Sequence, residues 1–230
     1  MTPASASEDH PLKNLTYLMT ISPMTAASLK PNEWLHGTAA HFEAWTFPPP
    51  SKDKYLESHS AVFLTKDLNF ALGAGSNVCQ SHVLQDAMVL APLTNPDDGE
   101  RLRKNLSRTA LGRNCAWVAM RGSWHGSWRS GQIMKYAGEP SVLQNILSQL
   151  RREFETAHPT FKNDHPELPY EHSMQVCAKH NLTRRWIETL VKEARQLGFD
   201  ALEANEVDNG IARPWLAALG PRALSKPIWR

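Results

Sequence analysis

W-L-H-G-T, at residues 34–38, brings a histidine and a glycine directly after two apolar residues. The pattern predicts a short strand that ends at His-Gly, and the small and apolar residues of 39–45 predict a helical turn or two behind it. An imidazole at a strand end offers a hydrogen-bonding group, and a glycine without Cβ lets a ligand approach the backbone closely. This stretch therefore suits the binding of a planar amide or a ribose hydroxyl, although a histidine before a turn is also common as ordinary structure.

Further elements can be predicted along the rest of the chain. Short apolar or β-forming runs predict strands, and apolar residues at helical spacing predict two amphipathic helices. We expect Asn181 or Thr183 to cap the second of these helices, which puts Arg184 and Arg185 in its first turn, and Gly198 to end it. The predicted strands lie at 61–65, within 82–93, at 199–204 and at 214–219; the predicted helices lie at 66–75, 143–154 and 183–197; irregular structure is predicted at 158–172 and an acidic turn at 205–210.

Length and composition favour one globular domain. The chain has 230 residues, a net charge of +2 and three widely spaced cysteines. Neither a disulfide framework nor zinc-ligand spacing is evident, so we expect a reducing compartment and no metal. We expect residues 1–14 to form a flexible N-terminus and residues 15–230 to form a single domain. The start lacks a secretory signal pattern, and residues 15–29 are too short to span a bilayer. This favours a soluble protein that is cytoplasmic, or delivered into a target cell without a cleavable signal peptide.

Residues 101–138 differ in charge from the rest of the chain. They contain eight basic residues and no acidic one, so the remainder is net acidic. Within them we expect a strand at 116–120 and a Gly/Ser/Trp-rich loop at 122–131. Lysines and arginines with interleaved tryptophans are typical of nucleic-acid binding, whereas a solvated charged face is the alternative. The residues concerned are Arg101, Arg103, Lys104, Arg108, Arg113, Arg121, Arg129 and Lys135 for phosphates, and Trp124 and Trp128 for base stacking.

Four segments, in this order, resemble the ADP-ribosyltransferase superfamily, on the branch shared by diphtheria-like toxins, poly(ADP-ribose) polymerases and small bacterial and phage domains. Together they span most of the chain outside a basic and helical insertion at about 101–181. They are L-H-G-T-A-A-H-F at 35–42, A-V-F-L-T-K-D-L-N-F-A at 61–71, V-L-A-P-L-T-N-P at 89–96, and G-F-D-A-L-E-A-N-E-V-D-N-G with A-L-G-P-R-A-L-S within 198–225.

The resemblance implies an α+β fold, in which a split pair of small antiparallel sheets with flanking helices encloses an NAD cleft. Such proteins take NAD as co-substrate, break the bond between nicotinamide and ribose, and pass the ADP-ribose to an acceptor. The transition state is oxocarbenium-like, so a carboxylate near the ribose stabilises the developing charge. A histidine, an aromatic residue and an acid form the family triad.

The resemblance also assigns residues to this triad. His36 matches the histidine that hydrogen-bonds the ribose, Gly37 matches the glycine whose backbone pairs with the nicotinamide carboxamide, and Thr38 follows them at the NAD-binding strand end. Phe63 falls at the aromatic position, and Phe70 is a second candidate. Many relatives have tyrosine there; a phenylalanine keeps the π face for stacking on nicotinamide and loses the hydroxyl.

The acid has three candidates. Relatives often read Asn, two variable residues and Glu, which places the acid at Asp208, an aspartate where most have glutamate. Glu206 lies two residues earlier, on the same side of an extended chain. Glu203, inside the predicted strand, is a third choice.

The functional hypothesis is an ADP-ribosyltransferase that modifies a macromolecular acceptor, protein or RNA/DNA, in the manner of a toxin or effector. One alternative is an NAD glycohydrolase, in which water is the acceptor. Another is a non-catalytic module that binds nucleic acid or protein on a degenerate form of the same fold. An antitoxin or inhibitor is not identifiable from the sequence.

Overall fold

The computed structural model describes residues 29–51, 54–164, 169–208 and 210–230, with only the backbone of Asp164 and Asp208. The predicted flexible N-terminus at 1–14 lies outside the described residues, as does nearly all of the segment 15–29. The described chain combines one mixed sheet with flanking helices, which confirms the expected α+β class.

Seven strands form the sheet in the order β4-β5-β6-β2-β1-β3-β7 within the described residues. All neighbouring pairs are antiparallel except β4 with β5, which are parallel. The bounds are β1 Glu33–Thr38, β2 Val62–Thr65, β3 Asn77–His82, β4 Val89–Leu90, β5 Ala201–Asp208, β6 Ile211–Ala218 and β7 Ile228–Trp229.

The junction between β1 and β2 is the narrowest in the sheet. These strands share a single residue pair, Leu35 with Thr65, whereas β1 pairs with β3 over its whole length from Glu33 to Thr38. We expected two separate small sheets. The strands instead form one sheet, whose halves β4-β5-β6-β2 and β1-β3-β7 meet at this one pair.

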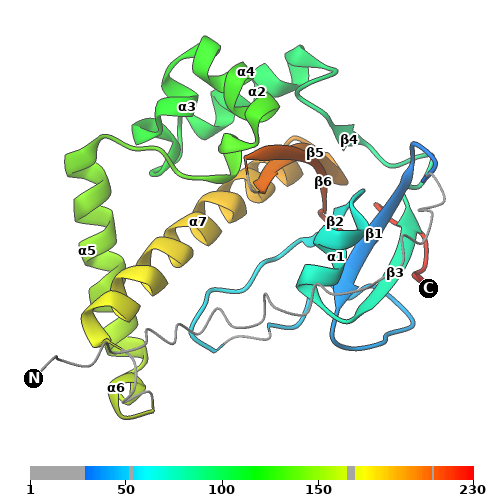
Figure 1. Ribbon diagram of the computed structural model, residues 1–230. Coiled ribbons are helices and arrows are strands. Elements are labelled where there is room, and N and C mark those ends of the chain that lie inside the picture. The colour runs from blue at the N-terminus through cyan, green and yellow to red at the C-terminus, as the bar shows by residue number, and fades with distance from the viewer. Residues whose placement is uncertain (1–28, 52–53, 165–168, 209) are drawn as a thin grey trace, which may run out of the picture.

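Seven α-helices accompany the sheet in the described chain (Figure 1). They are α1 Leu68–Ala74, α2 Pro96–Leu106, α3 Ala116–Ala119, α4 Arg121–Ser130, α5 Pro140–Ala157, α6 Phe161–Asp164 and α7 Tyr170–Gln196, with short 3₁₀ turns η2 Gly112–Asn114 and η3 Gln132–Met134. In Figure 1, α5 runs beside α7, α2 to α4 gather above β5 and β6, and α1 lies beside β1. None of the described helices is both long enough and apolar enough to span a membrane.

The largest core lies between the helices and one face of β5 and β6. Buried aromatic residues dominate it, because each tryptophan removes a large apolar surface from water. A smaller core covers the other face, and a third lies between β1 and α1. The main core includes Leu102, Trp124, Trp128, Trp186, Leu190, Leu202 and Trp215.

The predicted strand at 116–120 and the predicted loop at 122–131 are wrong, since these segments form helices α3 and α4. Trp124 and Trp128 are four residues apart, so both point to the same side of α4, and both are 0% exposed. Burial of two indoles outweighs the low helix propensity of Gly122 and Gly126. The rings therefore cannot stack on bases as the nucleic-acid interpretation required.

Segment 39–45 forms no helix, contrary to prediction. The Phe42 ring lies 5.1 Å from that of Trp229 and 4.9 Å from that of Trp45. In addition, the Trp229 indole nitrogen donates to the Phe42 carbonyl at 3.0 Å. These contacts hold the segment against the last strand in an irregular conformation.

Helix α7 begins thirteen residues earlier than predicted, at Tyr170 rather than Thr183. Asn181 is therefore not a cap. It is buried inside the helix, and its side-chain oxygen accepts from the Glu57 backbone N–H at 3.0 Å. The predicted stop is confirmed, because Gly198 follows the helix with a φ of 88°.

The predicted β-rich run at 82–93 contains only the short strand β4, and the main strand β3 precedes it. The predicted strands at 61–65, 199–204 and 214–219 correspond to β2, β5 and β6. Strand β5 continues through the predicted acidic turn as far as Asp208, because its residues pair with β6 all along that stretch.

Candidate active site

The site begins where β1 separates from β2. Leu35–Thr65 is the one residue pair between β1 and β2. Next to it, the His36 side chain connects the two strands, with its Nδ1 2.8 Å from the Phe63 carbonyl oxygen. A carbonyl oxygen only accepts, so Nδ1 carries the hydrogen and Nε2 of the neutral ring is an acceptor. The Trp45 ring packs edge-on against the imidazole at 5.3 Å between centroids, which fixes its orientation.

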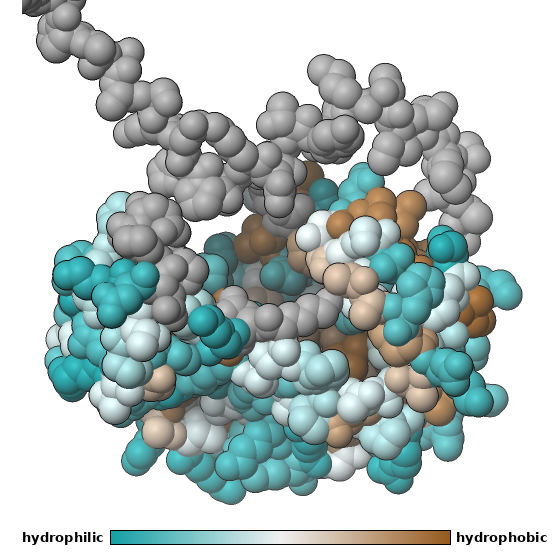
Figure 2. Space-filling view, turned by 90° about the horizontal axis from the view of Figure 1, so that it is seen from below, coloured by the Kyte–Doolittle hydropathy of each residue, from teal (hydrophilic) through white to brown (hydrophobic). Residues whose placement is uncertain are grey.

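A cleft of about 380 Å³ opens at this separation. Its walls come from β1, β2, α1, η3, α7, β5, β6 and the segment that precedes β2. The face seen in Figure 2 is hollowed between the helical part and the strand part of the molecule, with hydrophobic side chains inside the hollow. A cleft of this volume is within the range of small-molecule sites, about 300–1,000 Å³.

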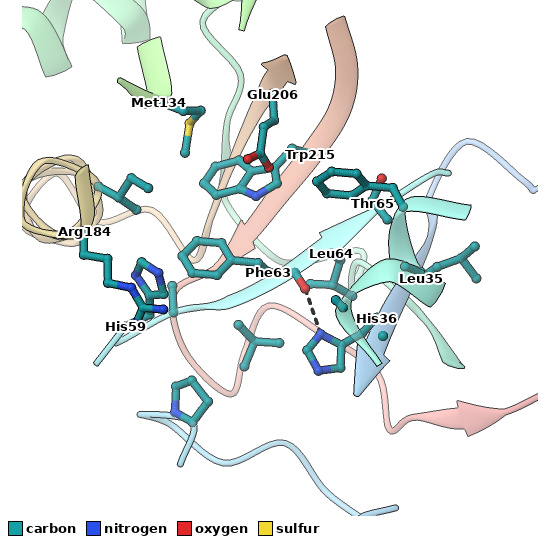
Figure 3. A pocket seen from close by; sticks show the side chains of 18 of the residues that line it. Leu35, His36, His59, Phe63, Leu64, Thr65, Met134, Arg184, Glu206 and Trp215 are labelled. Carbon is teal, nitrogen blue, oxygen red and sulfur yellow. Dashed lines mark hydrogen bonds between the residues drawn. The ribbon is translucent and has the colours of Figure 1, made fainter. Parts of the chain in front are cut away.

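Five of the predicted site residues line this one cleft, namely His36, Gly37, Phe63, Phe70 and Glu206. They come from β1, β2, α1 and β5, and more than 140 positions of sequence separate the first from the last. In Figure 3 the Phe63 and Trp215 rings lie between His36 on one side and Glu206 on the other.

The other predicted site residues do not join them. Thr38 is only 4% exposed, does not line the cleft, and accepts from the Ala40 backbone N–H at 3.4 Å. Alternation along β5 puts Glu203 on the face opposite to Glu206. Asp208 ends β5, and its side chain lies outside the described part of the chain.

Gly37 lacks a side chain because of helix packing. A Cβ at this position would lie 1.6 Å from the Ala71 carbonyl oxygen in α1. The glycine therefore lets α1 lie directly on β1, whereas we had explained it by the close approach of a ligand. This contact also sets the position of Phe70, which precedes Ala71 on the helix and lines the cleft.

An aromatic stack forms the middle of the cleft. The Phe63 and Trp215 rings are nearly parallel, at 4.9 Å and 20°, and His59 packs perpendicular to Phe63 at 4.6 Å. Phe63 is a predicted site residue, whereas His59 and Trp215 are not. No local motif marks either residue, because they reach the site through the pairing of β2 with β6 and through the segment before β2.

Helix α7 anchors that preceding segment. Arg184, predicted in a first turn, lies in the middle of α7, lines the cleft and donates to the Glu57 carbonyl. Arg185 bonds the Glu57 carboxylate at 2.6 Å, and Arg195 donates to Ser60 at 2.7 Å. The segment is thereby fixed over the cleft by three cations of one helix.

Glu188 completes this anchor. It accepts from the Ser60 backbone N–H at 2.9 Å and lies 3.4 Å from His59 Nδ1. Burial raises the pKa of its carboxyl, but the nearby His59 imidazole and the hydrogen bond from Ser60 outweigh burial and leave that pKa below its ordinary value. His59 is thus oriented by a carboxylate on one side and packs against Phe63 on the other.

Glu206 is held by the segment that follows α4. Gly131, with a φ of +77°, packs so closely that a Cβ would lie 2.7 Å from the Glu206 backbone carbon and 2.6 Å from the Val207 nitrogen. The Asn205 amide also donates to the Arg129 carbonyl at 3.1 Å. The basic segment therefore supports the strand that carries the candidate acid.

No family model, curated protein or solved structure matches this chain. The functional argument therefore depends on the chemistry of the cleft itself.

The groups that line the cleft can hold a ligand that joins a planar ring to a hydroxyl-bearing group. An imidazole acceptor lies at one wall, aromatic rings at the middle and a carboxylate at the other wall. Trp215 stacks on Phe63 and His59 packs perpendicular to it, so a ligand ring contacts only the part of the Phe63 ring that these two leave uncovered. Within the described residues, His, Cys, Asp and Glu side chains form no cluster of three that could hold a metal ion.

The basic segment is partly neutralised by the acidic residues just before it. Arg101 pairs with Asp98 at 2.9 Å, and Arg103 and Arg121 both approach Glu100, at 2.7 and 3.5 Å. The hydrogen bond from Arg103 lowers the pKa of Glu100 to about 2. These pairs reduce the charge that residues 101–138 can offer to a polyanion.

Proposed function

We propose that this protein is an NAD-dependent ADP-ribosyltransferase that transfers ADP-ribose to a macromolecular acceptor. One observation carries the proposal: His36, Phe63 and Glu206, from three distant stretches of sequence, line a single cleft. Each supplies a group that cleavage of the nicotinamide–ribose bond requires.

His36 binds the ribose in this proposal. Its Nδ1 hydrogen is committed to the Phe63 carbonyl, so Nε2 accepts a hydrogen bond from a ribose hydroxyl. The same bond connects the position of the imidazole to that of the Phe63 ring. A change at either residue is therefore expected to disturb both ribose and nicotinamide.

Glu206 stabilises the positive charge that develops on the ribose as nicotinamide leaves. It is preferred over Glu203, which lies on the opposite face of β5, because it alone of the two lines the cleft. A carboxylate held by the fold in a cleft contributes more to such a transition state than one in bulk water. Asp208 remains an alternative acid.

Labelled NAD tests the proposal. We expect the purified protein to release nicotinamide, and Glu206→Gln to lower that rate by roughly 100-fold or more, the effect typical of one electrostatic stabilising group. Glu203→Gln is the matched control on the same strand and is expected to retain the rate. Equal rates in wild type and Glu206→Gln would contradict the assignment of the acid.

The fate of the label separates transfer from hydrolysis. Label on a macromolecule supports the transferase, and digestion with protease or nuclease identifies the acceptor. Free ADP-ribose without a labelled macromolecule would instead indicate an NAD glycohydrolase. A protein that releases no nicotinamide under either condition would overturn both.

A further inference from the structure

A second chamber of about 460 Å³ adjoins the cleft. It lies between α5, α7, the turn η3 and the end of β5. The two spaces share five lining residues, which form the border between them: His59, Met134, Arg184, Ile187 and Glu206. The candidate acid therefore faces both spaces.

The chamber is basic. Lys135, Lys179 and His180 line it together with Arg184, while Glu206 is the one acidic residue among its described lining. Within the described residues, neither lysine pairs with a carboxylate, in contrast to Arg185 on the same helix, which binds both Glu57 and Glu153. Two exposed lysines that form no ion pair among the described residues, beside a single acidic side chain, favour an anionic ligand in this chamber.

The inner surface of the chamber is apolar. Leu143 and Leu147 from α5 face Leu182 and Ile187 from α7, and the half-buried Tyr136 ring lies beside them. Apolar walls with cations at the rim match a group that is planar and hydrophobic at one end and anionic at the other. The volume is that of a small-molecule site and exceeds what a single acidic side chain of a peptide needs.

We infer that this chamber binds the acceptor, and that the acceptor is a nucleotide of a single-stranded nucleic acid, with its base on the apolar walls and its phosphates at Lys135 and Lys179. The inference rests on the proposed transferase function. Single strands suit a concave site because their bases can be turned out of a stack into it.

The direction of attack explains why the chamber takes the acceptor rather than the ADP half of NAD. In the proposed function nicotinamide packs against Phe63, which lines the cleft but not the second chamber, whereas Glu206 borders both spaces. We therefore expect the face of the ribose opposite to nicotinamide to point toward the second chamber. The ribose–nicotinamide bond breaks, and its electron pair leaves with neutral nicotinamide. A base nitrogen or phosphate oxygen of the acceptor provides the pair for the new bond, and any proton on an attacking nitrogen passes to Glu206 and then to water.

The test uses Lys135→Glu/Lys179→Glu, with Lys192→Glu as the matched control, because Lys192 is exposed on α7 and does not line the chamber. All three side chains are exposed, so the variants are expected to fold. Fluorescence anisotropy with a labelled single-stranded DNA or RNA reports binding without any turnover. We expect the double variant to bind at least tenfold more weakly than wild type and the control to bind equally well.

The salt dependence of the anisotropy measurement gives a second readout of the phosphate contacts. Loss of two phosphate contacts is expected to reduce the slope of log K against log salt by roughly 1.4. Competition by mononucleotides distinguishes a site for one free nucleotide from a site that needs a strand. Equal affinity of wild type and double variant would overturn the inference.

A second arm measures label transfer from NAD to the same oligonucleotides and to protein. Loss of oligonucleotide labelling in the double variant, at least tenfold larger than any change in the KM for NAD, supports the inference. A rise in that KM which accounts for the whole loss would assign the chamber to the phosphates of NAD, and label on protein alone would also overturn the inference. Absence of nicotinamide release in wild type would defeat the proposed function, while the anisotropy arm would still report on the chamber.

Discussion

At the scale of single residues, His36 connects the two halves of the sheet. Its imidazole replaces a backbone ladder bond where β1 leaves β2, and it faces the cleft that this separation creates. A residue that serves both structure and ligand binding is expected to affect activity more than stability. One hydrogen bond contributes only about 1 kcal/mol to folding.

Replacing His36 by Ala is expected to lower nicotinamide release by about tenfold or more, because each 1.4 kcal/mol of lost transition-state stabilisation reduces the rate tenfold. His172→Ala, at an exposed position near the start of α7, is the control. Steady-state rates with labelled NAD measure the effect. Thermal denaturation of both variants shows whether the fold persists, and an unchanged rate in a folded His36→Ala protein would contradict the role of this residue.

At the scale of secondary structure, the approach of the turn after α4 to β5 positions the candidate acid. Gly131→Ala places a Cβ within 2.7 Å of the backbone of Glu206 and Val207, at a φ that an alanine adopts only with strain. We expect the free energy of unfolding to fall by about 2 kcal/mol or more, and nicotinamide release to fall as Glu206 moves.

The matched control for this prediction is Gly126→Ala. Gly126 lies inside α4, and a Cβ there meets no atom within 4 Å. Because alanine is the better helix former, this variant is expected to be more stable by up to about 1 kcal/mol. Urea denaturation measures both variants, and a Gly131→Ala protein as stable as wild type would show that the two segments can separate freely.

The anchor between α7 and the segment before β2 gives a pH-dependent prediction. Because the folded-state pKa of Glu188 lies below its ordinary value of 4.5, its charge stabilises the fold fully above that value. This stabilisation is lost as the pH falls through the lowered pKa. Glu188→Gln removes the charge and keeps the oxygen that accepts from Ser60.

We therefore expect Glu188→Gln to unfold at a lower urea concentration than wild type at pH 6, with a difference of about 1 kcal/mol or less because the side chain is partly exposed. At pH 3, below the ordinary pKa of 4.5, the difference between the two curves is expected to be smaller than at pH 6. A difference that stayed constant between these pH values would show that the charge of Glu188 does not stabilise the anchor.

Some elements of this chain could be predicted from residue patterns and others could not. The strands that carry His36 and Phe63 and the first part of β5 could be predicted from short apolar runs, and α1 from the run at 66–75. The part of β5 that carries Glu206 was predicted as an acidic turn, because its pairing with β6 is not visible in its own residues. Helix α4 could not, because its sequence is rich in glycine and serine and forms a helix only when Trp124 and Trp128 are buried together. Trp215 and His59 reach the cleft through tertiary contacts that local sequence does not encode.

At the scale of the whole molecule, the sheet consists of two parts with unequal support. Strands β5 and β6 contribute to the two larger cores, whereas β1 adds only Trp34 to the second of them and otherwise packs with β3 on the small core with α1. The two parts share one residue pair. Segments with less buried apolar surface open more often without global unfolding.

Native-state hydrogen exchange is expected to show this difference. Amides of β5, β6 and α7 should exchange slowest, and those of β1, β3 and β7 measurably faster, because the second group opens at the β1–β2 junction. Mass spectrometry of peptic fragments measures both groups in one sample. Identical protection throughout the sheet would indicate that the single pair couples the halves as strongly as a full ladder.

The buried pair Trp124 and Trp128 has a consequence for how this chain can vary. These rings belong to the same core as Leu202 and Trp215, on the strands that frame the cleft. Deleting helices α2–α4, or transferring them to another protein, would expose the buried face of those strands and the two indoles to water. Under the proposed function, we therefore expect acceptor preference to change by surface substitution around the chamber, but not by exchange of helices α2–α4 as a unit.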